Sequence, residues 1–257
     1  MAGIEIGQYN ILDVDGSANC YNVVKTNTEL PFKFCAVKGN GFDAVVATGV
    51  EEYWETLATS NAAFNSGNLG YLLEEINLYR NCVTFKINGR SGSALLAAKG
   101  SDGQILWSWH IWITKNLPGA SNMTNGVTVM DLNLGASEPG TGTNQPMGFL
   151  YQWGRKDPFP APYHVAYSSL MKFNPEGRMK SEAKTDANLD YAIKNPSTFI
   201  DNNSTRWDAS GTSVWAEKKT IYDPCPPGYR VPTSAELTGL SFGDWDGSYY
   251  RYTELGC

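Results

Sequence analysis

The chain has 257 residues, of which 42% are hydrophobic, 18% are charged and 12% are aromatic. The low charge and the high aromatic content argue against disorder and favour a β-rich protein with a filled interior. The 20 basic and 26 acidic residues give a net charge of −6, which argues against nucleic-acid binding. The most apolar run, 105–113, contains His110 and is far shorter than the roughly 20 residues of a membrane helix, so no membrane insertion is expected.

The start of the sequence and its cysteines give only indirect information on the compartment. Residues 1–10 contain Glu5 and neither a basic start nor a long apolar stretch, so we expect no secretory signal here. The protein then either stays inside the cell or is a mature sequence behind an added Met1. The cysteines form no CxxC pair, which disfavours a structural zinc site; they are Cys20, Cys35, Cys82, Cys225 and Cys257.

Up to about residue 115, short apolar runs separated by Gly and Asn turns predict β-strands. The expected strands are 19–24, 32–37, 82–87, 94–99 and 104–114. In the last strand, alternation places Trp107, Trp109 and Ile111 on one face and Ser108 and His110 on the other. The spacing of these runs predicts an immunoglobulin-like β-sandwich over residues 1–115.

Tight turns are expected at Asn88-Gly89 and Asp102-Gly103. No segment has a sustained helical period, but 71–79 is a candidate helix. The cysteines of the expected strands lie in apolar patterns, which favours buried free thiols. A Cys35–Cys82 bridge is the less favoured alternative.

After residue 115 the composition changes to long loops and short helices. The run 147–153 is an expected helix that ends at Gly154. Thr233 and Glu236 have the spacing of a capping box at a helix start, with Leu237 expected to face inward. We therefore expect a second domain over residues 116–257.

Three segments of this second half, 129–136, 148–160 and 221–236, follow the run ILWSWHIWIT in an order that resembles surface and fimbria-associated proteins of Bacteroidetes. Their C-terminal module is similar to the Fibrobacter succinogenes major paralogous domain, a relative of the C-type lectin-like fold. The run CPPGYRVPT at 225–233 is the most specific part of the resemblance. The resemblance implies a binding module displayed at a cell surface, a fimbrial tip or a phage tail, and it identifies no ligand.

The sequence departs from sugar-binding C-type lectins at both of their calcium motifs. Glu138-Pro139 is followed by Gly140, and Trp245-Asp246 is followed by Gly247. The family module also continues for longer after its second helix, so the closing strands are expected to be absent, shortened or supplied by another molecule.

The proline-rich run around Cys225 is expected to be a rigid corner that leads into the helix cap, because proline fixes φ and Gly228 permits a turn. Cys225 and Cys257 are candidates for a disulfide, with free thiols as the equal alternative.

The sequence offers few residues for catalysis. His110 is expected to be a structural histidine of its strand, and His164 a loop residue. A Cys–His or Ser–His pair stays open, but no local signature such as GxSxG supports one. The segment 135–141 has the glycine spacing of a P-loop without its lysine and is expected to be a turn.

No cofactor is expected, and calcium is the one weak alternative. The runs starting at Asp13 and at Asp244 begin like calcium loops, but Val24 and Leu255 stand at the twelfth positions, where an EF-hand requires glutamate.

The C-terminal run 241–252 is rich in Tyr, Trp, Ser, Gly and Asp, the composition of binding paratopes. Aromatic rings there could stack on a ligand while polar groups bind it; the alternative is a strand pair whose rings fill the core. The candidate ligand-binding residues are Asp244, Trp245, Asp246, Ser248, Tyr249, Tyr250, Arg251 and Tyr252.

The sequence thus predicts a β-rich, two-domain, non-enzymatic protein: an immunoglobulin-like β-sandwich followed by an α+β C-type lectin-like module. We expect it outside the cell or at a cell surface, or on a phage virion, where it binds a glycan or protein. The alternatives are a structural fimbrial or phage-tail subunit that assembles with other subunits, the variable target protein of a diversity-generating retroelement, and an enzyme similar to formylglycine-generating oxidases.

Overall fold

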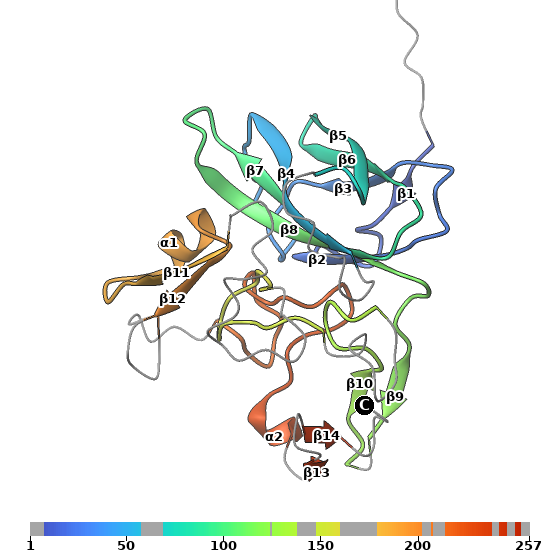
Figure 1. Cartoon of the computed structure of the whole chain (residues 1–257), viewed down its shortest axis with the longest axis vertical. Helices are drawn as coiled ribbons and strands as arrows, with labels where there is room; N and C mark the ends of the chain where they lie inside the picture. The colour runs from blue at the N-terminus through green and yellow to red at the C-terminus, as the bar shows by residue number, and fades with distance from the viewer. Residues whose placement is uncertain are drawn as a thin grey trace, which may run out of the picture.

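The computed structural model describes residues 8–57, 69–123, 125–137, 148–159, 179–201, 207 and 214–237, and the backbone of 242–245 and 250–252. Eight strands before residue 115 form two packed sheets of four strands each (Figure 1). The first sheet has the order β1 (Asn10–Ile11), β3 (Phe32–Cys35), β6 (Cys82–Ile87) and β5 (Leu73–Tyr79). The second has the order β2 (Cys20–Val24), β8 (Ile105–Thr114), β7 (Gly92–Lys99) and β4 (Gly49–Leu57). The protein is therefore β-rich, as its sequence predicts.

Parallel pairing occurs once in each sheet, β1 with β3 and β2 with β8. The remaining neighbours in the two sheets are antiparallel. The five strands expected from the sequence are all present, and the expected turns at Gly89 and Gly103 have φ angles of 81° and 78°. Positive φ is the conformation that glycine adopts without a steric cost.

Three strands of the two sheets, the two-residue β1 and the longer β4 and β5, were not expected from the sequence. β4 was not identified, and the candidate helix at 71–79 is instead strand β5. The helix prediction is wrong because the pairing register of β5 shifts between Glu74 and Asn77, and this irregularity interrupts the alternation of the strand. β5 and β6 are joined through Arg80 and Asn81, both at positive φ, the conformation of a type I′ turn.

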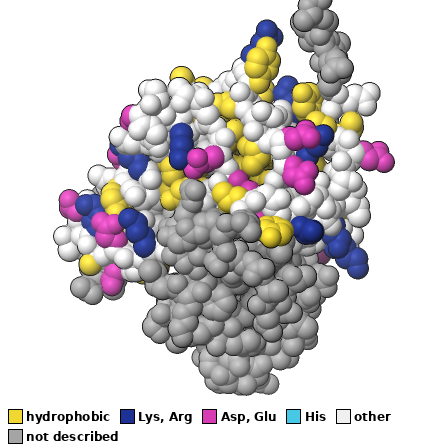
Figure 2. Space-filling model, turned by 45° about the horizontal axis from the view of Figure 1, so that its top comes forward, with side chains coloured by type: hydrophobic (Ala, Val, Ile, Leu, Met, Phe, Trp, Pro, Cys, Tyr) yellow, Lys and Arg dark blue, Asp and Glu magenta, His cyan; other side chains and the backbone are white. Residues whose placement is uncertain are grey.

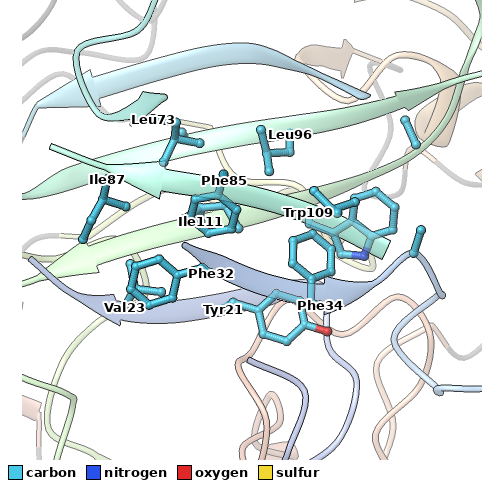
Figure 3. Packing of buried hydrophobic residues seen from close by; sticks show 14 of the residues in the cluster. Tyr21, Val23, Phe32, Phe34, Leu73, Phe85, Ile87, Leu96, Trp109 and Ile111 are labelled. Atoms are coloured by element: carbon cyan, nitrogen blue, oxygen red, sulfur yellow. The ribbon is translucent and has the colours of Figure 1, made fainter. Parts of the chain in front are cut away.

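Alternating side chains of the two sheets fill the core between them. Phe32, Phe34 and Phe85 of the first sheet meet Trp109 and Ile111 of the second (Figure 3). The Phe34 ring lies edge-on to Trp109 at 5.3 Å between centroids, and Phe32 stacks on Phe85 at 5.4 Å. Such aromatic pairs contribute about 0.5–1.5 kcal/mol each beyond their buried area.

The second sheet is buried on both faces. All residues of β7 except Lys99 are buried, and only Leu106 of β8 is half-buried. The outer face is covered by the chain after residue 115: Trp112 packs with Leu132 and Ala136, and Trp54 and Leu95 pack with Met179. The part of the chain predicted as a second domain therefore packs directly on the sandwich.

This second part has short elements joined by long loops. β9 (Ala120–Asn122) pairs with β10 (Thr128–Met130), and β11 (Lys180–Ala183) pairs with β12 (Thr198–Asp201) around the helix α1 (Leu189–Lys194). Helix α2 (Ser234–Leu237) is followed by the antiparallel pair β13 (Phe242–Trp245) and β14 (Tyr250–Tyr252).

Two local expectations for this part are wrong. The described residues of 147–153 form no helix; Leu150 forms a β-bridge with Phe159, and Gly148 and Gly154 both have positive φ. Gly154 cannot be replaced without strain, because an added Cβ would lie 2.1 Å from the side chain of Val214. Leu237, expected to face inward, is exposed.

No helix in the described part of the chain is long and apolar enough to span a membrane.

Candidate functional site

The predicted ligand-binding residues lie in and around the β13–β14 hairpin. Asp244 and Trp245 are in β13, and Tyr250, Arg251 and Tyr252 are in β14. Backbone register places Trp245 opposite Tyr250 and Phe242 opposite Tyr252. Of the other candidates, Asp246, Ser248 and Tyr249 lie outside the described residues, between the two strands. The chain thus brings the two described halves of the predicted set to neighbouring strands.

The hairpin lies with α2 at the end of the molecule opposite the sandwich (Figure 1). Helix α2 begins with the predicted capping box, which is confirmed: the Thr233 N–H donates to Glu236 Oε2 at 2.8 Å, and the Glu236 N–H donates to Thr233 Oγ1 at 3.3 Å. Arg230 binds both oxygens of the same carboxylate, at 2.8 and 2.6 Å. The bond from Arg230, with those from Thr233, lowers the pKa of Glu236 to about 2.

The proline-rich corner before α2 is built around the buried carboxylate of Asp223. Its Oδ1 accepts the Cys225 N–H and its Oδ2 accepts the Val231 N–H, both within 2.9 Å. Lys219 Nζ lies 2.9 Å from Asp223 and donates to the carbonyl oxygens of Cys225 and Tyr229. The corner is thus held by interactions of its own side chains.

Cys225 is a buried free thiol in this corner, and Cys257, its candidate partner, lies outside the described residues. Burial, with the charge of Asp223, raises the pKa of the Cys225 thiol well above its usual range. A buried, protonated thiol is a poor nucleophile.

Asn19 joins this corner to the sandwich. Its Nδ2 donates to the carbonyl oxygens of Ile221 and Asp223, at 2.7 and 2.9 Å, and its Oδ1 accepts from Trp107 Nε1 at 3.0 Å. The buried amide therefore has three partners, from a neighbouring strand and from a loop 200 residues away in the chain.

A cysteine and a histidine meet on the outer face of the second sheet. Cys20 and His110 are opposite each other in β2 and β8, and Cys20 Sγ lies 3.4 Å from His110 Nδ1. Burial raises the pKa of the Cys20 thiol far above its usual range and lowers the pKa of His110 to about 3. Both groups are neutral and inaccessible at neutral pH, so the arrangement is structural. The expectation that His110 is a structural histidine is consistent with this placement.

A second buried polar cluster consists of Ser108, Lys156 and Asp157. This cluster was not predicted from the sequence. Lys156 Nζ lies 2.6 Å from both Asp157 Oδ1 and Ser108 Oγ, and the Ser108 hydroxyl donates to Asp157 Oδ1 at 2.6 Å. All three residues are at most 3% exposed, so no substrate reaches the serine hydroxyl. A signal was present in the sequence, because three charged residues follow one another between Gly154 and Pro158.

Arg155, the first residue of that charged run, is also buried. Its guanidinium donates to the backbone oxygens of Thr198, Ala192, Asn195 and Pro196. Burial lowers its pKa to about 10, which leaves it charged at neutral pH. Arg155 therefore ties the 148–159 loop to the α1–β12 segment.

One open hollow of about 400 Å³ lies beside α1 and the β7–β8 turn, lined by Tyr53, Lys99, Gly103, Gln104, Ile105, Lys194 and Asn195. Both lysines are already paired, Lys99 with Glu51 at 2.7 Å and Lys194 with Asp190 at 2.8 Å. Because both lysines are paired, the hollow carries no excess of positive charge. On the face of the molecule drawn in Figure 2, basic and acidic side chains are likewise interspersed.

The described residues contain no cluster of three or more His, Cys, Asp or Glu side chains arranged to hold a metal ion. The run at Asp13 forms a turn, in which the Gly16 N–H donates to the Asp13 carbonyl oxygen and Asp13 Oδ2 accepts the Cys35 N–H. His164, the residues of 138–141 and the side chains of 244–247 lie outside the described part.

Comparisons of the chain with protein-family models, with curated proteins and with solved structures found no match.

Proposed function

We propose that this protein is a non-enzymatic, surface-displayed binding protein that recognises a glycan or a protein ligand through the β13–β14 hairpin. The observation that carries the proposal is the place of this aromatic-rich hairpin, after a capped helix and at the end of the molecule opposite the sandwich (Figure 1). The sandwich then serves as the spacer or docking unit, and the second half presents the hairpin.

The strand order supports an immunoglobulin-like sandwich for the first half. If β3 to β8 are taken as strands B to G of that fold, β3, β6 and β5 correspond to the B-E-D sheet, and β8, β7 and β4 to the G-F-C sheet. The parallel β2 at the free side of β8 is an additional edge strand. The α+β C-type lectin-like character of the second half is part of the proposal and rests on the sequence resemblance.

The residue types and the backbone register of the hairpin support the proposed binding role. Trp245 and Tyr250 are opposed across the two strands, and opposed residues of an antiparallel pair lie on the same face of the ribbon. Aromatic residues opposed in this way would provide a stacking platform for a sugar ring or an apolar side chain, with little rotamer entropy to lose. Asp244, Asp246 and Arg251 supply the polar groups of this proposed surface.

Two described nucleophilic groups lie beside a residue that could act as a base or an acid, the Cys20 thiol beside His110 and the Ser108 hydroxyl beside Lys156 and Asp157, and both are fully buried. Cys225, the cysteine required by an oxidase-like alternative, is buried and protonated. These placements favour binding over catalysis for the described part of the chain.

The proposal is tested with a Trp245→Ala/Tyr250→Ala double variant on a glycan array and against candidate protein ligands, with and without calcium. We expect binding to fall at least tenfold, since truncating interface aromatic anchors typically costs about 2 kcal/mol or more. Tyr79→Ala is the matched control, because it removes a ring that is 66% exposed on β5 of the sandwich. Unchanged binding by the double variant would contradict the proposal, as would a large loss of thermal stability, which would place the two rings in a core.

A further inference from the structure

Cys35 and Cys82 are directly opposite each other on the outer face of the first sheet. They are register partners in the antiparallel pair β3–β6. In both strands, alternate residues enter the core: Phe34 beside Cys35, and Val83 beside Cys82, are buried. Cys35 is exposed and Cys82 is half-buried, which corrects the expectation of buried thiols: the alternation points both away from the core.

The hydrogen bonds around this pair show which kind of register position it occupies. The Cys35 N–H donates to Asp13 Oδ2 at 2.9 Å, away from β6, and the next N–H, that of Ala36, donates to the Asn81 carbonyl oxygen at 2.8 Å. Cys35 and Cys82 therefore form a non-hydrogen-bonded pair. In such pairs the Cα atoms are about 4.5 Å apart and the side chains approach most closely. A disulfide requires Cα atoms about 4.4–6.8 Å apart.

The remaining described cysteines, Cys20 and Cys225, are both buried. Among the described cysteines, only Cys35 and Cys82 lie next to each other and are also accessible to solvent. Burial raises the pKa of Cys35 to about 11, and the adjacent Asp13 carboxylate and Cys82 add to the shift. The Cys35 thiol is thus mostly protonated at neutral pH, which slows its oxidation without preventing it.

We propose that Cys35 and Cys82 are a reversible oxidation site that closes to an intramolecular cross-strand disulfide when a small-molecule disulfide is the oxidant. One cysteine thiolate attacks a sulfur of the oxidant, breaks its S–S bond and releases one small thiol. The second cysteine thiolate then attacks the protein sulfur of the mixed disulfide and releases the other small thiol. Two cysteine thiols are oxidised, the oxidant is reduced by two electrons, and the two cysteine protons end on the released thiols.

The disulfide would join β3 to β6 and close the chain between positions 35 and 82. Covalent closure of a loop of this length removes conformational freedom from the unfolded chain. We expect the oxidised protein to unfold about 5–10 °C above the reduced protein, if the bond fits without distortion.

The test uses the full chain carrying Cys257→Ser, so that the C-terminal thiol takes no part. The protein is incubated with oxidised glutathione, the remaining thiols are alkylated under denaturing conditions, and a non-reducing digest is examined by mass spectrometry. We expect the loss of two thiols and one linked peptide pair containing Cys35 and Cys82, with Cys20 and Cys225 alkylated. Stable glutathione adducts on Cys35 or Cys82 without closure, failure of both Cys35 and Cys82 to react, or linkage of either to another cysteine would each overturn the proposal.

Three further variants separate the chemistry from folding. Cys35→Ser and Cys82→Ser, at accessible positions, should each stop at a glutathione adduct and show no rise in Tm. Asp13→Asn keeps an oxygen that can accept the Cys35 N–H but removes the negative charge, so the pKa of Cys35 falls. Each unit of that fall should speed alkylation of Cys35 at pH 8 about threefold, since the tenfold gain in thiolate outweighs its lower nucleophilicity. Slower alkylation in Asp13→Asn would contradict the assigned role of the carboxylate.

Discussion

The two faces of β8 are both buried but differ in chemistry. The face toward the first sheet carries Trp107, Trp109, Ile111 and Ile113, whereas the face toward the second half carries Ser108, His110, Trp112 and Thr114. Apolar packing is not directional, so the inner face tolerates changes that keep volume. A buried polar group, in contrast, is costly unless its partner is placed correctly. The outer face therefore determines how the second half of the chain is seated on the sheet.

The largest expected effect comes from the buried ion pair of this outer face. Asp157→Ala leaves the Lys156 ammonium buried without its carboxylate, and should lower the free energy of unfolding by about 3–5 kcal/mol. Ile111→Val on the inner face should cost only about 0.5–1.5 kcal/mol. Urea denaturation measures both variants.

The ion-pair prediction has an internal control. Adding Lys156→Met to Asp157→Ala removes the unpaired charge, so the double variant should be more stable than Asp157→Ala alone. A double variant that is less stable than Asp157→Ala would show that the difference between the two faces does not come from charge pairing.

A smaller, pH-dependent effect is expected at His110. Its pKa falls from 6.5 to about 3 in the folded protein because of burial, so below pH 6.5 the unfolded chain takes up a proton that the folded chain does not. The stability that His110 contributes is complete above about pH 6.5 and is lost as the pH falls toward 3. Relative to His110→Phe, the protein should lose about 1.4 kcal/mol per pH unit in this window, or about 2 kcal/mol at pH 5. If chemical denaturation gives the same pH dependence of stability for the protein and for His110→Phe, the prediction is wrong.

The smallest effect is expected away from both faces, at the start of α2. Thr233→Ala removes the hydroxyl that caps the Glu236 N–H and should destabilise this turn by about 1 kcal/mol, while Thr233→Ser should retain most of the cap. Hydrogen exchange at the Glu236 amide measures the change locally. A large fall in the global Tm would contradict a local effect and would show that the start of α2 is coupled to the sheet.

The strands of the sandwich were largely readable from the sequence because burial on one face imposes a period of two. β8 shows this most clearly, with its alternation and the turn at Gly103. β5 was wrongly predicted as a helix because its shifted register breaks the alternation of buried and exposed residues. The spacing of Leu72, Leu73 and Ile76 also fits one face of a helix. Side-chain exposure was less readable, since Cys35 occurs in an apolar run and still points outward.

The polar clusters could not be derived from local patterns, because their partners are far apart in the chain. Ser108 and Lys156 are separated by 48 residues, and Asn19 and Asp223 by 204. The run Arg155-Lys156-Asp157 looks like a solvated loop until the structure shows what covers it. For the hairpin, the sequence predicted the aromatic composition, and the structure adds the backbone register of Trp245 and Tyr250.

The parallel pairing of β2 with β8 has a consequence for the order of folding. Cys20 and His110, partners in this pair, are separated by 90 residues, so β2 has no neighbour in its sheet until Thr114 has been synthesised. Contacts between such distant residues close large loops and slow the search for the native state. During synthesis, β2 therefore lacks its native strand partner while the ribosome completes almost half of the polypeptide, and such an unpaired strand is open to binding by a chaperone.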